Sequence, residues 1–553
     1  MRRLITAFGL AAIIAVGVHA AADAPMAAAA QNKDREAVRA LLKKGADVNE
    51  AQGDGTTALH WAAMNGDADM AQMLVTAGAN VRATTRLGAY TPLFLAARGG
   101  YADVVRVLLA AGADAKSRTS NGTTPLMIAA ASGDTRTITS LVENGAEIDA
   151  KDDARGETPL MFAAGYNRVD AVKLLLSKGA NHKATTKVMD LFALTAPEEE
   201  NMARQSGAGA AQRPADVAGA TRAYRYNELI SSQGGLTALL FAARQGYIET
   251  AMALLDAGAD INQPNAGDKT TPLLMAIING HFDLAMQLID RGADVNAAAF
   301  NGVAPLYGVL NIQWAPKSLY PSPKAYQQQK ATYLDLLQKL LDKGADPNAR
   351  VSRKVWYQAY NSDYAGFDEA GATPFFRAAY ASDVAAMKLL VTRGADPNIG
   401  TFKPAGRPFT GEGTRQVKDT SGLPPIPYGG PGVMPLHAAT GVGYGEGFAA
   451  NSHRYAPTGF MPAIKYLVEE MGADVNGADH EGNTPLHLCA SRGDNECIRY
   501  LVSKGADVMR VNREGNTTVD MANGPVQRTQ PYPETIKLLE SLGAKNNHRC
   551  ITC

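Results

Sequence analysis

Short hydrophobic runs alternate with short polar segments along almost the whole chain, and the runs come in pairs. Between residues 91 and 112, Leu93, Ala96 and Ala97 share one face of a predicted helix, and the apolar residues of Val104–Leu109 supply the bulk of the core from a second helix. Thr91 offers a hydroxyl that caps the first helix, and a proline at the next position loses no hydrogen bond there. Gly112 can take the left-handed conformation that ends the second helix. The pattern predicts a helix–turn–helix unit.

The same unit recurs at a nearly constant interval. The dipeptide Gly-Ala, usually followed by Asp and then Val-Asn or Pro-Asn, has its glycine at positions 45, 78, 112, 145, 179, 258, 292, 344, 394, 472, 505 and 543. A second marker, Thr-Pro-Leu or a close variant, keeps step with it and begins at Thr57, Thr91, Thr124, Thr158, Thr237, Thr271, Thr373 and Thr484, with weaker copies at Ala304 and Met434. Six of the eleven glycine spacings are 33 or 34 residues.

Both markers resemble the ankyrin repeat family, whose period is about 33 residues and whose signature runs T-P-L-H-x-A and then G-A-D-x-N. The resemblance covers nearly all of residues 24–545 and counts twelve units. It implies an all-α fold, an ankyrin-repeat solenoid of about twelve helix–turn–helix units with loop insertions. It also implies binding of partners through the hairpin tips and the concave face formed by the first helices. One unit cannot bury its own apolar face, so neighbouring units must stack.

Five longer spacings mark insertions and give the expected organisation of the chain. Residues 182–235 are rich in Ala, Arg and Glu with few large apolar residues, which is typical of a flexible loop. We therefore expect repeats 1–5 at 24–181, the inserted loop at 182–235, repeats 6–7 at 236–298, repeats 8–10 at 299–476, repeats 11–12 with a C-terminal cap at 477–545, and a tail with a C-x-x-C motif at 546–553.

The insertions of repeats 8–10 are rich in aromatic residues. Residues 301–460 hold 20 of the 37 aromatic residues of the chain. Extra residues after Asn311 and Gly441 fall at helix–helix turns, whereas those at 350–371 and 399–433 fall at the opposite, hairpin edge. Rigid rings on both rims of a groove favour binding, because they supply contact area at little entropy cost. Candidate contacts for a partner are Trp314, Tyr320, Trp356, Tyr357, Tyr360, Tyr364, Tyr428, Tyr444 and Tyr455.

Two alternatives to aromatic binding stay open at this point. The same rings could instead pack the inserted loops onto the solenoid and contact no partner. The Pro- and Gly-rich run Leu423–Pro431 reads as a stiff connector, and it could instead be a ligand for the aromatic groove of another protein.

The N-terminus reads as a secretory signal peptide over residues 1–22. Two arginines precede an apolar or small-residue run of 15 residues, Leu4–Val18, which is too short to span a bilayer, and small residues follow it. The alanine-rich style is typical of bacterial proteins. We therefore expect a cleaved signal, a periplasmic or secreted protein, and no transmembrane segment after cleavage. A retained membrane anchor is the alternative.

Charge and composition exclude several classes of function. The chain has 54 Lys and Arg against 54 Asp and Glu, whereas a nucleic-acid binder needs an excess of basic residues. There is no Gly-Lys dipeptide for a Walker A loop, no G-x-S-x-G and no H-E-x-x-H. His60, His437 and His487 occupy the repeat's own histidine position, where we expect structural hydrogen bonds between turns. The sequence indicates neither an enzyme nor a bound cofactor.

The four cysteines lie in two groups of two along the sequence. Cys489 and Cys497 stand where sister repeats have Ala and Val, which predicts buried thiols, with a disulfide as the alternative in an exported protein. Cys550 and Cys553, with His548 nearby, form a C-x-x-C motif at the end of the chain. It is interpreted as a terminal disulfide or reactive tail, with a redox, metal or haem-related role as the alternative.

Three hypotheses of function follow. The leading one is an exported, non-enzymatic scaffold that binds a protein, a peptide or another extended ligand. The second is a redox or haem-related accessory protein that uses Cys550 and Cys553. The third is an enzyme assembled in the groove from acids and bases such as Asp363, Glu369 and His453, which nothing in their spacing favours.

Overall fold

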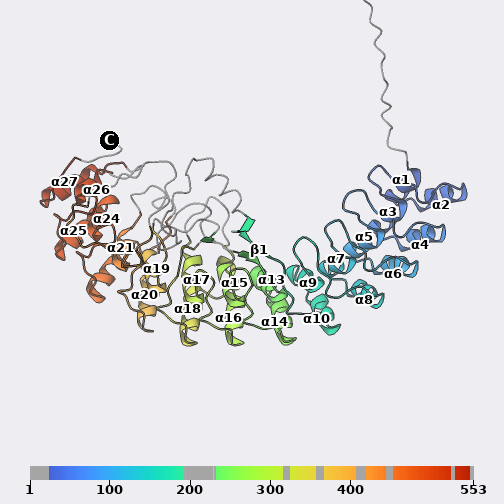
Figure 1. The fold of residues 1–553 in the computed structure, drawn as a ribbon, viewed down its shortest axis with the longest axis horizontal. Helices are drawn as coiled ribbons and strands as arrows, with labels where there is room; N and C mark the ends of the chain where they lie inside the picture. The colour runs from blue at the N-terminus through green and yellow to red at the C-terminus, as the bar shows by residue number, and fades with distance from the viewer. Residues whose placement is uncertain are drawn as a thin grey trace, which may run out of the picture. The chain divides into compact units, whose positions relative to one another are not determined.

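The computed structural model is an all-α repeat fold, which confirms the predicted fold class (Figure 1). It describes residues 24–191, 193–194, 228–229, 232–315, 324–355, 367–405, 419–443, 453–524 and 530–548. The chain divides into two compact units, Met1–Asn181 and His182–Cys553. The division falls at the start of the predicted insertion.

The described part of unit 1 is a stack of five helix pairs. The first helices of the pairs are α1 (Pro25–Gln31), α3 (Ala58–Asn65), α5 (Pro92–Gly99), α7 (Pro125–Ser132) and α9 (Pro159–Gly165). The second helices are α2 (Arg35–Lys43), α4 (Ala68–Thr76), α6 (Ala102–Ala110), α8 (Thr135–Glu143) and α10 (Val169–Ser177). Each row packs along its own neighbours, so the alanines of the first helices and the leucines of the second become the core.

The repeated residues form these helices for the expected physical reasons. The hydroxyl of Thr91 accepts a hydrogen bond of 3.1 Å from the backbone N–H of Phe94, which caps α5. Nε2 of His60 lies 3.0 Å from the carbonyl oxygen of Tyr90 in the next repeat. This hydrogen bond between turns confirms the structural role predicted for His60.

The hairpin tips of unit 1 touch one another through the backbone. The N–H of Arg86 donates to the carbonyl oxygen of Asp54 at 2.8 Å, and the N–H of Asp153 donates to the carbonyl oxygen of Asn121 at 3.0 Å. Gly122 adopts a φ of 81°, and a Cβ there would lie 2.5 Å from the backbone nitrogen of Asp153. Glycine is therefore required both by the turn and by the close approach of the next tip.

Unit 2 contains seven further helix pairs in its described residues. The first helices are α13 (Ala238–Gln245), α15 (Pro272–Ile278), α17 (Pro305–Gln313), α19 (Pro374–Tyr380), α21 (Pro435–Thr440), α24 (Pro485–Ser491) and α26 (Thr518–Ala522). The second helices are α14 (Ile248–Asp256), α16 (Phe282–Asp290), α18 (Tyr333–Asp342), α20 (Val384–Val391), α23 (Phe460–Lys465) with the π-helical turn η3 (Tyr466–Glu470), α25 (Asn495–Ser503) and α27 (Pro533–Ser541). A short 3-10 turn, η1 (Ala325–Gln328), lies between α17 and α18.

The long connections of unit 2 lie where the spacing predicts them. The segments between α17 and α18 and between α21 and α23 separate the two helices of one repeat. Those between α18 and α19 and between α20 and α21 precede a first helix, at the hairpin edge.

The predicted flexible loop at 182–235 has ordered ends. Strand β1 (Val188–Asp190) pairs antiparallel with β2 (Ser232–Gly234), with Val188 opposite Gly234 and Asp190 opposite Ser232. The Thr186 hydroxyl also accepts a hydrogen bond of 2.9 Å from the N–H of Leu236. The two ends of the insertion are therefore held together beside α13. Most of its interior, residues 195–227, lies outside the described residues.

Repeat 10 accommodates one extra residue before its terminal glycine as the π-helical turn η3. Two consecutive acids of this turn contact different neighbours. Glu469 pairs with Lys504 of repeat 11 at 3.0 Å, whereas Glu470 pairs with Lys388 of repeat 9 at 3.1 Å. The turn therefore links the outer helices of three repeats through exposed ion pairs.

Several aromatic residues of repeats 8–10 lie inside the stack. Tyr307, Phe367, Phe376 and Tyr380 belong to one continuous cluster of buried residues. The Phe367 ring stands 4.7 Å from that of Tyr380 in an edge-on arrangement. Part of the aromatic enrichment therefore serves packing, as one of the two sequence interpretations holds.

Candidate functional site

A proline-rich stretch crosses the hairpin edge of unit 2, and we call residues 419–431 the proline segment. Arg513, at the tip between repeats 11 and 12, binds its first half. Nη1 donates to a carboxylate oxygen of Asp419 at 2.6 Å, and Nη2 donates to the carbonyl of Pro424 at 2.7 Å. Nε donates to the carbonyl of His480 at 3.0 Å, so this guanidinium ties the segment to the repeat tips.

Lys403 binds the second half of the proline segment. Its Nζ donates to the carbonyl oxygen of Ile426 at 2.7 Å, and its backbone N–H donates to the carbonyl oxygen of Gly430 at 2.7 Å. The ammonium also lies 5.6 Å from the ring centroid of Tyr428. That ring is 52% exposed. A large aromatic side chain is thus presented to solvent on a segment fixed on both sides.

The anchor at Asp419 is a strong one for a surface group. A hydrogen bond from the Ser421 hydroxyl, the backbone N–H of Ser421 and the guanidinium of Arg513 together lower the pKa of the Asp419 carboxyl to about 2. The carboxylate therefore stays ionised, and the contact with Arg513 stays a charged one, at any ordinary pH.

A second exposed tyrosine lies at the helix–helix turn of repeat 10. Tyr455 is 39% exposed, and its ring packs 4.4 Å from that of Phe460. The guanidinium of Arg492 lies 3.9 Å from the Phe460 ring centroid on the side of repeat 11. Tyr455 is therefore the outer member of a stack of rings, supported from behind and partly open to solvent.

His453, named above as a possible catalytic base, is buried at this turn. Its ring stacks on Tyr380 at 4.2 Å, and Nε2 lies 2.7 Å from the Tyr380 carbonyl oxygen. Burial lowers the pKa of His453 to about 3, against the effect of that carbonyl, and the positive charges of Arg377 and Arg492 lower it further. A histidine in this state packs between repeats as a neutral ring. Glu369 is also buried, and Asp363 lies outside the described residues.

Trp314 is the candidate contact that the structure places deepest. It is 8% exposed, and its indole N–H donates to Asp383 at 2.9 Å. The Tyr333 hydroxyl donates to the same carboxylate at 2.8 Å. Asp383 also caps α20 by accepting from the N–H of Ala386. Trp314 therefore holds two repeats together, and the packing interpretation describes it.

Other candidate residues fall outside the described part of the chain. These are Tyr320, Trp356, Tyr357, Tyr360, Tyr364, Tyr444, Cys550 and Cys553. His548 is described, is exposed, and donates from its backbone N–H to the side chain of Asn546 at 2.8 Å. The terminal C-x-x-C motif and its proposed chemistry stay a prediction.

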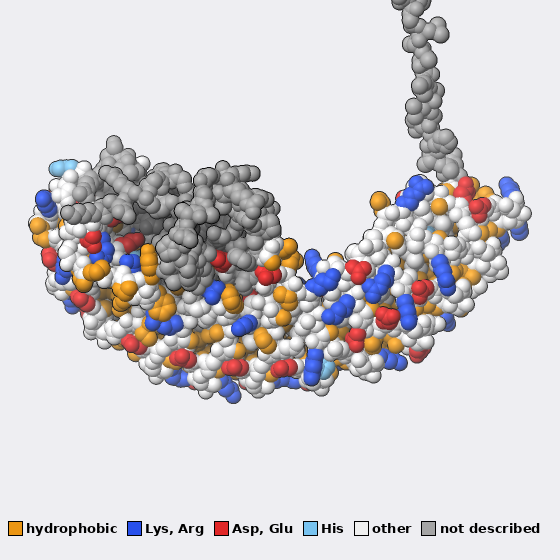
Figure 2. Space-filling view, viewed as in Figure 1, with side chains coloured by type: hydrophobic (Ala, Val, Ile, Leu, Met, Phe, Trp, Pro, Cys, Tyr) orange, Lys and Arg blue, Asp and Glu red, His pale blue; other side chains and the backbone are white. Residues whose placement is uncertain are grey.

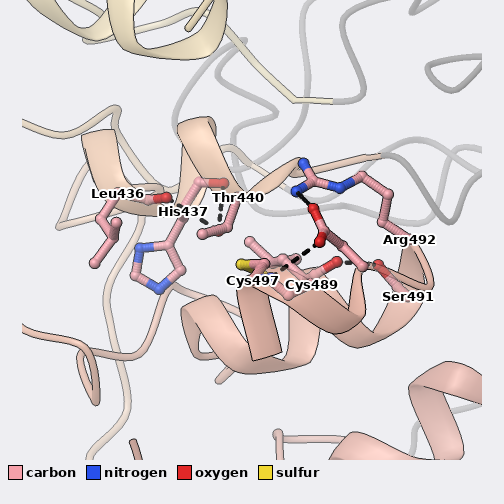
Figure 3. Close-up of a disulfide and its surroundings, with 9 residues drawn as sticks. Leu436, His437, Thr440, Cys489, Ser491, Arg492 and Cys497 are labelled. Carbon is pink, nitrogen blue, oxygen red and sulfur yellow. Dashed lines mark hydrogen bonds and ion pairs between the residues drawn. A yellow bond between two sulfur atoms is a disulfide. The ribbon is translucent and has the colours of Figure 1, made fainter. Parts of the chain in front are cut away.

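Cys489 and Cys497 are joined by a disulfide (Figure 3). The structure therefore shows the disulfide that the sequence analysis gave as the alternative to buried free thiols. The bond connects α24 with α25, and both residues are fully buried. Asp494, which accepts from the N–H of Cys497 at 3.0 Å, also pairs with Arg492 at 2.5 Å. The bond therefore closes the two helices of repeat 11 onto each other.

Sequence reasoning missed the cations that organise this part of unit 2. Arg513 and Lys403 carry no motif. Arg377 left a readable signal, because it occupies the fourth position after the threonine of its repeat, where Leu95 and Leu488 stand in sister repeats. A charged residue in an otherwise apolar column of aligned repeats is the pattern that identifies it.

The visible surface shows a mixture of charges, as the neutral composition predicts. Figure 2 shows Lys and Arg side chains interspersed with Asp and Glu, and in unit 1 Arg118 lies 3.5 Å from Asp153. Within the described ranges, no helix has the length and hydrophobicity to cross a bilayer. No cluster of three or more metal-ligating side chains occurs among the same residues.

Comparison with known proteins supports the reading of the repeats. A family model described as ankyrin repeats (3 copies) matches residues 25–119, 93–186, 219–299 and 452–549. Together these segments cover more than half of the chain.

Individual relatives match shorter stretches. Human protein phosphatase 1 regulatory subunit 27 is 35% identical over 88 residues, which are 16% of this chain and 53% of that protein. Human ankyrin repeat domain-containing protein 13B is 47% identical over 83 residues, which are 13% of each chain. Alpha-latrocrustotoxin-Lt1a from Latrodectus tredecimguttatus is 26% identical over 212 residues, 38% of this chain and 10% of that protein. The chain thus spans about half of the length of the first relative and far less of the other two.

Proposed function

We propose that this chain, which belongs to the ankyrin repeat family, is a non-enzymatic scaffold that binds a protein or peptide partner at the hairpin edge of repeats 9–12. The proposal names the proline segment, with Tyr428 as its central contact. Fold alone does not determine function, so the site has to carry the argument.

The observation that carries it is the state of Tyr428. An aromatic ring that is 52% exposed is normally mobile. The chain around Tyr428 is instead held on both sides: Arg513 donates a hydrogen bond to the segment before it, and the residues after it form backbone hydrogen bonds with Lys403. Binding such a ring loses little conformational entropy, and buried tyrosines are frequent hot spots of protein interfaces. Tyr455, stacked on Phe460, offers a second contact of the same kind.

The relatives favour a protein partner over other ligands. One of them is named as a regulatory subunit of protein phosphatase 1, that is, as a protein that acts through another protein. It matches only part of this chain, so we transfer the mode of action, protein recognition by ankyrin repeats, and not the phosphatase.

We further propose that the chain is exported after cleavage of residues 1–22, which lie outside the described residues. Two features support export. One is the charged, apolar and small-residue order of the N-terminus. The other is the buried disulfide Cys489–Cys497, since disulfides persist mainly in oxidising compartments. Mass spectrometry of the protein from its native host would locate the mature N-terminus, and an intact Met1 would contradict the proposal.

The binding experiment compares two exposed tyrosines. The mature protein is used as bait, captured partners are identified by mass spectrometry, and the dissociation constant is measured with the purified partner. We expect Tyr428→Ala to weaken binding by about thirtyfold, roughly 2 kcal/mol, as for an interface hot spot. The matched control is Tyr166→Ala, because Tyr166 is 59% exposed but lies in unit 1. Equal affinity of both variants and the unmodified protein would contradict the proposed site.

A further inference from the structure

Within the proline segment, the exposure of residues 423–428 repeats with a period of three. Leu423 and Ile426 are half-buried, and the two residues after each of them are exposed: Pro424, Pro425, Pro427 and Tyr428. A polyproline II helix has three residues per turn, so residues three apart lie on one side of it. One side of this stretch therefore packs on the protein. Two ridges face solvent, one made of Pro424 and Pro427 and the other of Pro425 and Tyr428.

The prolines impose the extended backbone that this pattern requires. Each proline ring fixes φ at about −65°, and a residue that precedes a proline is restricted to extended or polyproline II conformations. Leu423, Pro424 and Ile426 all precede a proline. Residues 423–427 belong to no helix and no strand. These residues therefore follow a polyproline II course.

A tight turn continues this course as far as Tyr428. The N–H of Gly430 donates to the carbonyl oxygen of Pro427 at 3.0 Å, and Gly429 has a φ of 74°, whereas the φ of Tyr428 is negative. A turn with a positive φ only at its third residue is of type II, in which the second residue is extended. Tyr428 therefore continues the ridge that begins at Pro425.

The stretch is held from its inner side. Arg513 and Lys403 donate hydrogen bonds to the carbonyl oxygens of Pro424 and Ile426. A Cβ at Gly430 would lie 2.9 Å from Cγ2 of Ile426, so the turn closes against this side chain. These contacts use the backbone and the inner side chain and leave the proline rings at the surface. A partner that binds the rings therefore loses little free energy in ordering the chain.

Two polar features beside the ridges are available to a partner. The carbonyl oxygen of Pro425 accepts no hydrogen bond from the described residues. Lys403 forms no ion pair in the same part of the chain, and its ammonium lies 5.6 Å from the ring centroid of Tyr428. Arg513 differs, because its charge is compensated by Asp419. An uncompensated positive charge thus stands beside the exposed tyrosine, and it is complementary to an acidic group.

We propose that the two ridges of Leu423–Tyr428 are the ligand for a partner domain with an aromatic groove that is bordered by an acidic side chain. Aromatic grooves bind polyproline II segments because these segments are already ordered before binding. A stiff connector needs the same prolines, but it does not need a tyrosine exposed on the same ridge. The inference rests on the proposed binding of a protein at Tyr428, and it names the class of that protein.

The first test uses decaproline as the probe. It is titrated into the complex of the full chain with the purified partner, and displacement of the chain and NMR signals of the partner's aromatic side chains are followed. We expect displacement, with an affinity at least about tenfold weaker than that of the full chain, because decaproline lacks the tyrosine and the anchors. A glycine–serine peptide of the same length is the control. No displacement by decaproline, or equal displacement by both peptides, would overturn the proposal.

Two variants test the outer ridge without removing an anchor. Pro424→Ala and Pro427→Ala delete one exposed ring each and keep the carbonyl that Arg513 or the turn binds. We expect each to weaken partner binding by about tenfold. The matched control is Pro431→Ala, since Pro431 is exposed in the same segment but follows the turn. Partner affinity equal to that of this control in both variants would identify the stretch as a connector.

Arg513→Ala separates the loss of rings from the loss of order. It loosens the segment and removes no ring, so we expect it to weaken partner binding less than either proline variant does. Equal losses in all three variants would show that order alone, and not the proline rings, determines the affinity, which would overturn the proposal.

Salt tests the acidic border of the groove. Raising sodium chloride from about 50 to 300 mM should weaken partner binding by about threefold, because it screens the attraction between Lys403 and the acid. An affinity that does not change with salt would overturn the assignment of the acid.

The proposed function and this inference fail in different ways. If Tyr428→Ala loses affinity while decaproline does not displace the chain and both proline variants bind normally, this inference fails and the proposed site stands. If Tyr428→Ala binds normally while the proline variants lose affinity and decaproline displaces the chain, the proline ligand stands and Tyr428 is not its central contact.

Discussion

Met434 leaves Nδ1 of His437 without a hydrogen-bond partner in the described structure. In sister repeats the residue three positions before the histidine is a threonine. The hydroxyl of Thr57 lies 2.8 Å from Nδ1 of His60, and the hydroxyl of Thr484 lies 2.9 Å from Nδ1 of His487. Repeat 10 thus retains the histidine of the motif and lacks the residue that completes its hydrogen bonding.

We expect Met434→Thr to stabilise unit 2. The new hydroxyl would cap α21 and pair with the His437 ring, and a threonine cap contributes about 1 kcal/mol. Urea denaturation followed by circular dichroism measures the change. Met434→Val is the matched control, because valine has the shape of threonine without its hydroxyl. Equal stability of the two variants would show that the cap does not form.

Buried histidines should make stability depend on pH. Burial lowers the pKa of His453 to about 3 and that of His487 to about 4, whereas an unfolded histidine has a pKa of about 6.5. Below that value the unfolded chain binds protons that the folded chain does not. The contribution of each histidine to the free energy of unfolding is therefore fully present above pH 6.5. As the pH falls below 6.5, this contribution decreases by about 1.4 kcal/mol per pH unit until the pKa of the folded state is reached.

The measurement is the free energy of unfolding of unit 2 between about pH 7 and pH 4.5. We expect His453→Gln to reduce the slope of this free energy against pH, even though it lowers stability at neutral pH. His548→Gln, on the exposed tail, is the control variant. An unchanged slope in His453→Gln would mean that this ring accepts a proton in the folded state.

The repeat markers predicted the helices well because the signals are local. Thr91, Pro92 and Gly112 act within one turn of the helix they begin or end, so their spacing specifies the helix bounds without knowledge of the tertiary structure. The predicted long connections of repeats 8–10 follow from the same arithmetic.

The roles of single aromatic residues could not be predicted in this way. Trp314 and Tyr428 both stand in insertions, yet one is 8% and the other 52% exposed. The difference arises from Asp383, 69 residues after Trp314, and from Arg513, 85 residues after Tyr428. The pairing of β1 with β2 depends on a similar distant contact. Such partners are not visible in local composition.

Arg513 should control the order of the proline segment. We expect Arg513→Ala to release the Asp419 and Pro424 anchors and to speed chymotrypsin cleavage after Tyr428, because proteases require a mobile chain. Limited proteolysis with mass spectrometry measures the rate. Arg499→Ala changes an exposed arginine of α25 and is the control. If both variants were cleaved at the rate of the unmodified chain, Arg513 would not hold the segment.

The same segment should respond to acid only under extreme conditions. The pKa of Asp419 is lowered to about 2, so its carboxylate remains charged at mildly acidic pH. The charge, and with it the ion pair with Arg513, is lost only as the pH falls through that value. We expect the cleavage rate at Tyr428, measured with pepsin, to rise below about pH 3 in the unmodified chain. Arg513→Ala should show fast cleavage already at higher pH. A rise centred near pH 4 in the unmodified chain would show that Asp419 is not stabilised in its charged form.

The disulfide Cys489–Cys497 should stabilise repeat 11 and mark the compartment of the protein. It closes a loop of eight residues, for which chain entropy predicts about 2.5 kcal/mol. We expect dithiothreitol to lower the melting temperature of the unmodified chain. The double variant Cys489→Ala with Cys497→Val carries the residues of sister repeats, so it should fold. Its melting temperature should be close to that of the reduced protein and should not change when dithiothreitol is added.

Thiol titration of unfolded protein from its native host shows whether the two cysteines are oxidised in vivo. Two free thiols at these positions, mapped by alkylation and mass spectrometry, would argue against export to an oxidising compartment, since a buried pair with Cα atoms 6.0 Å apart is placed to oxidise there.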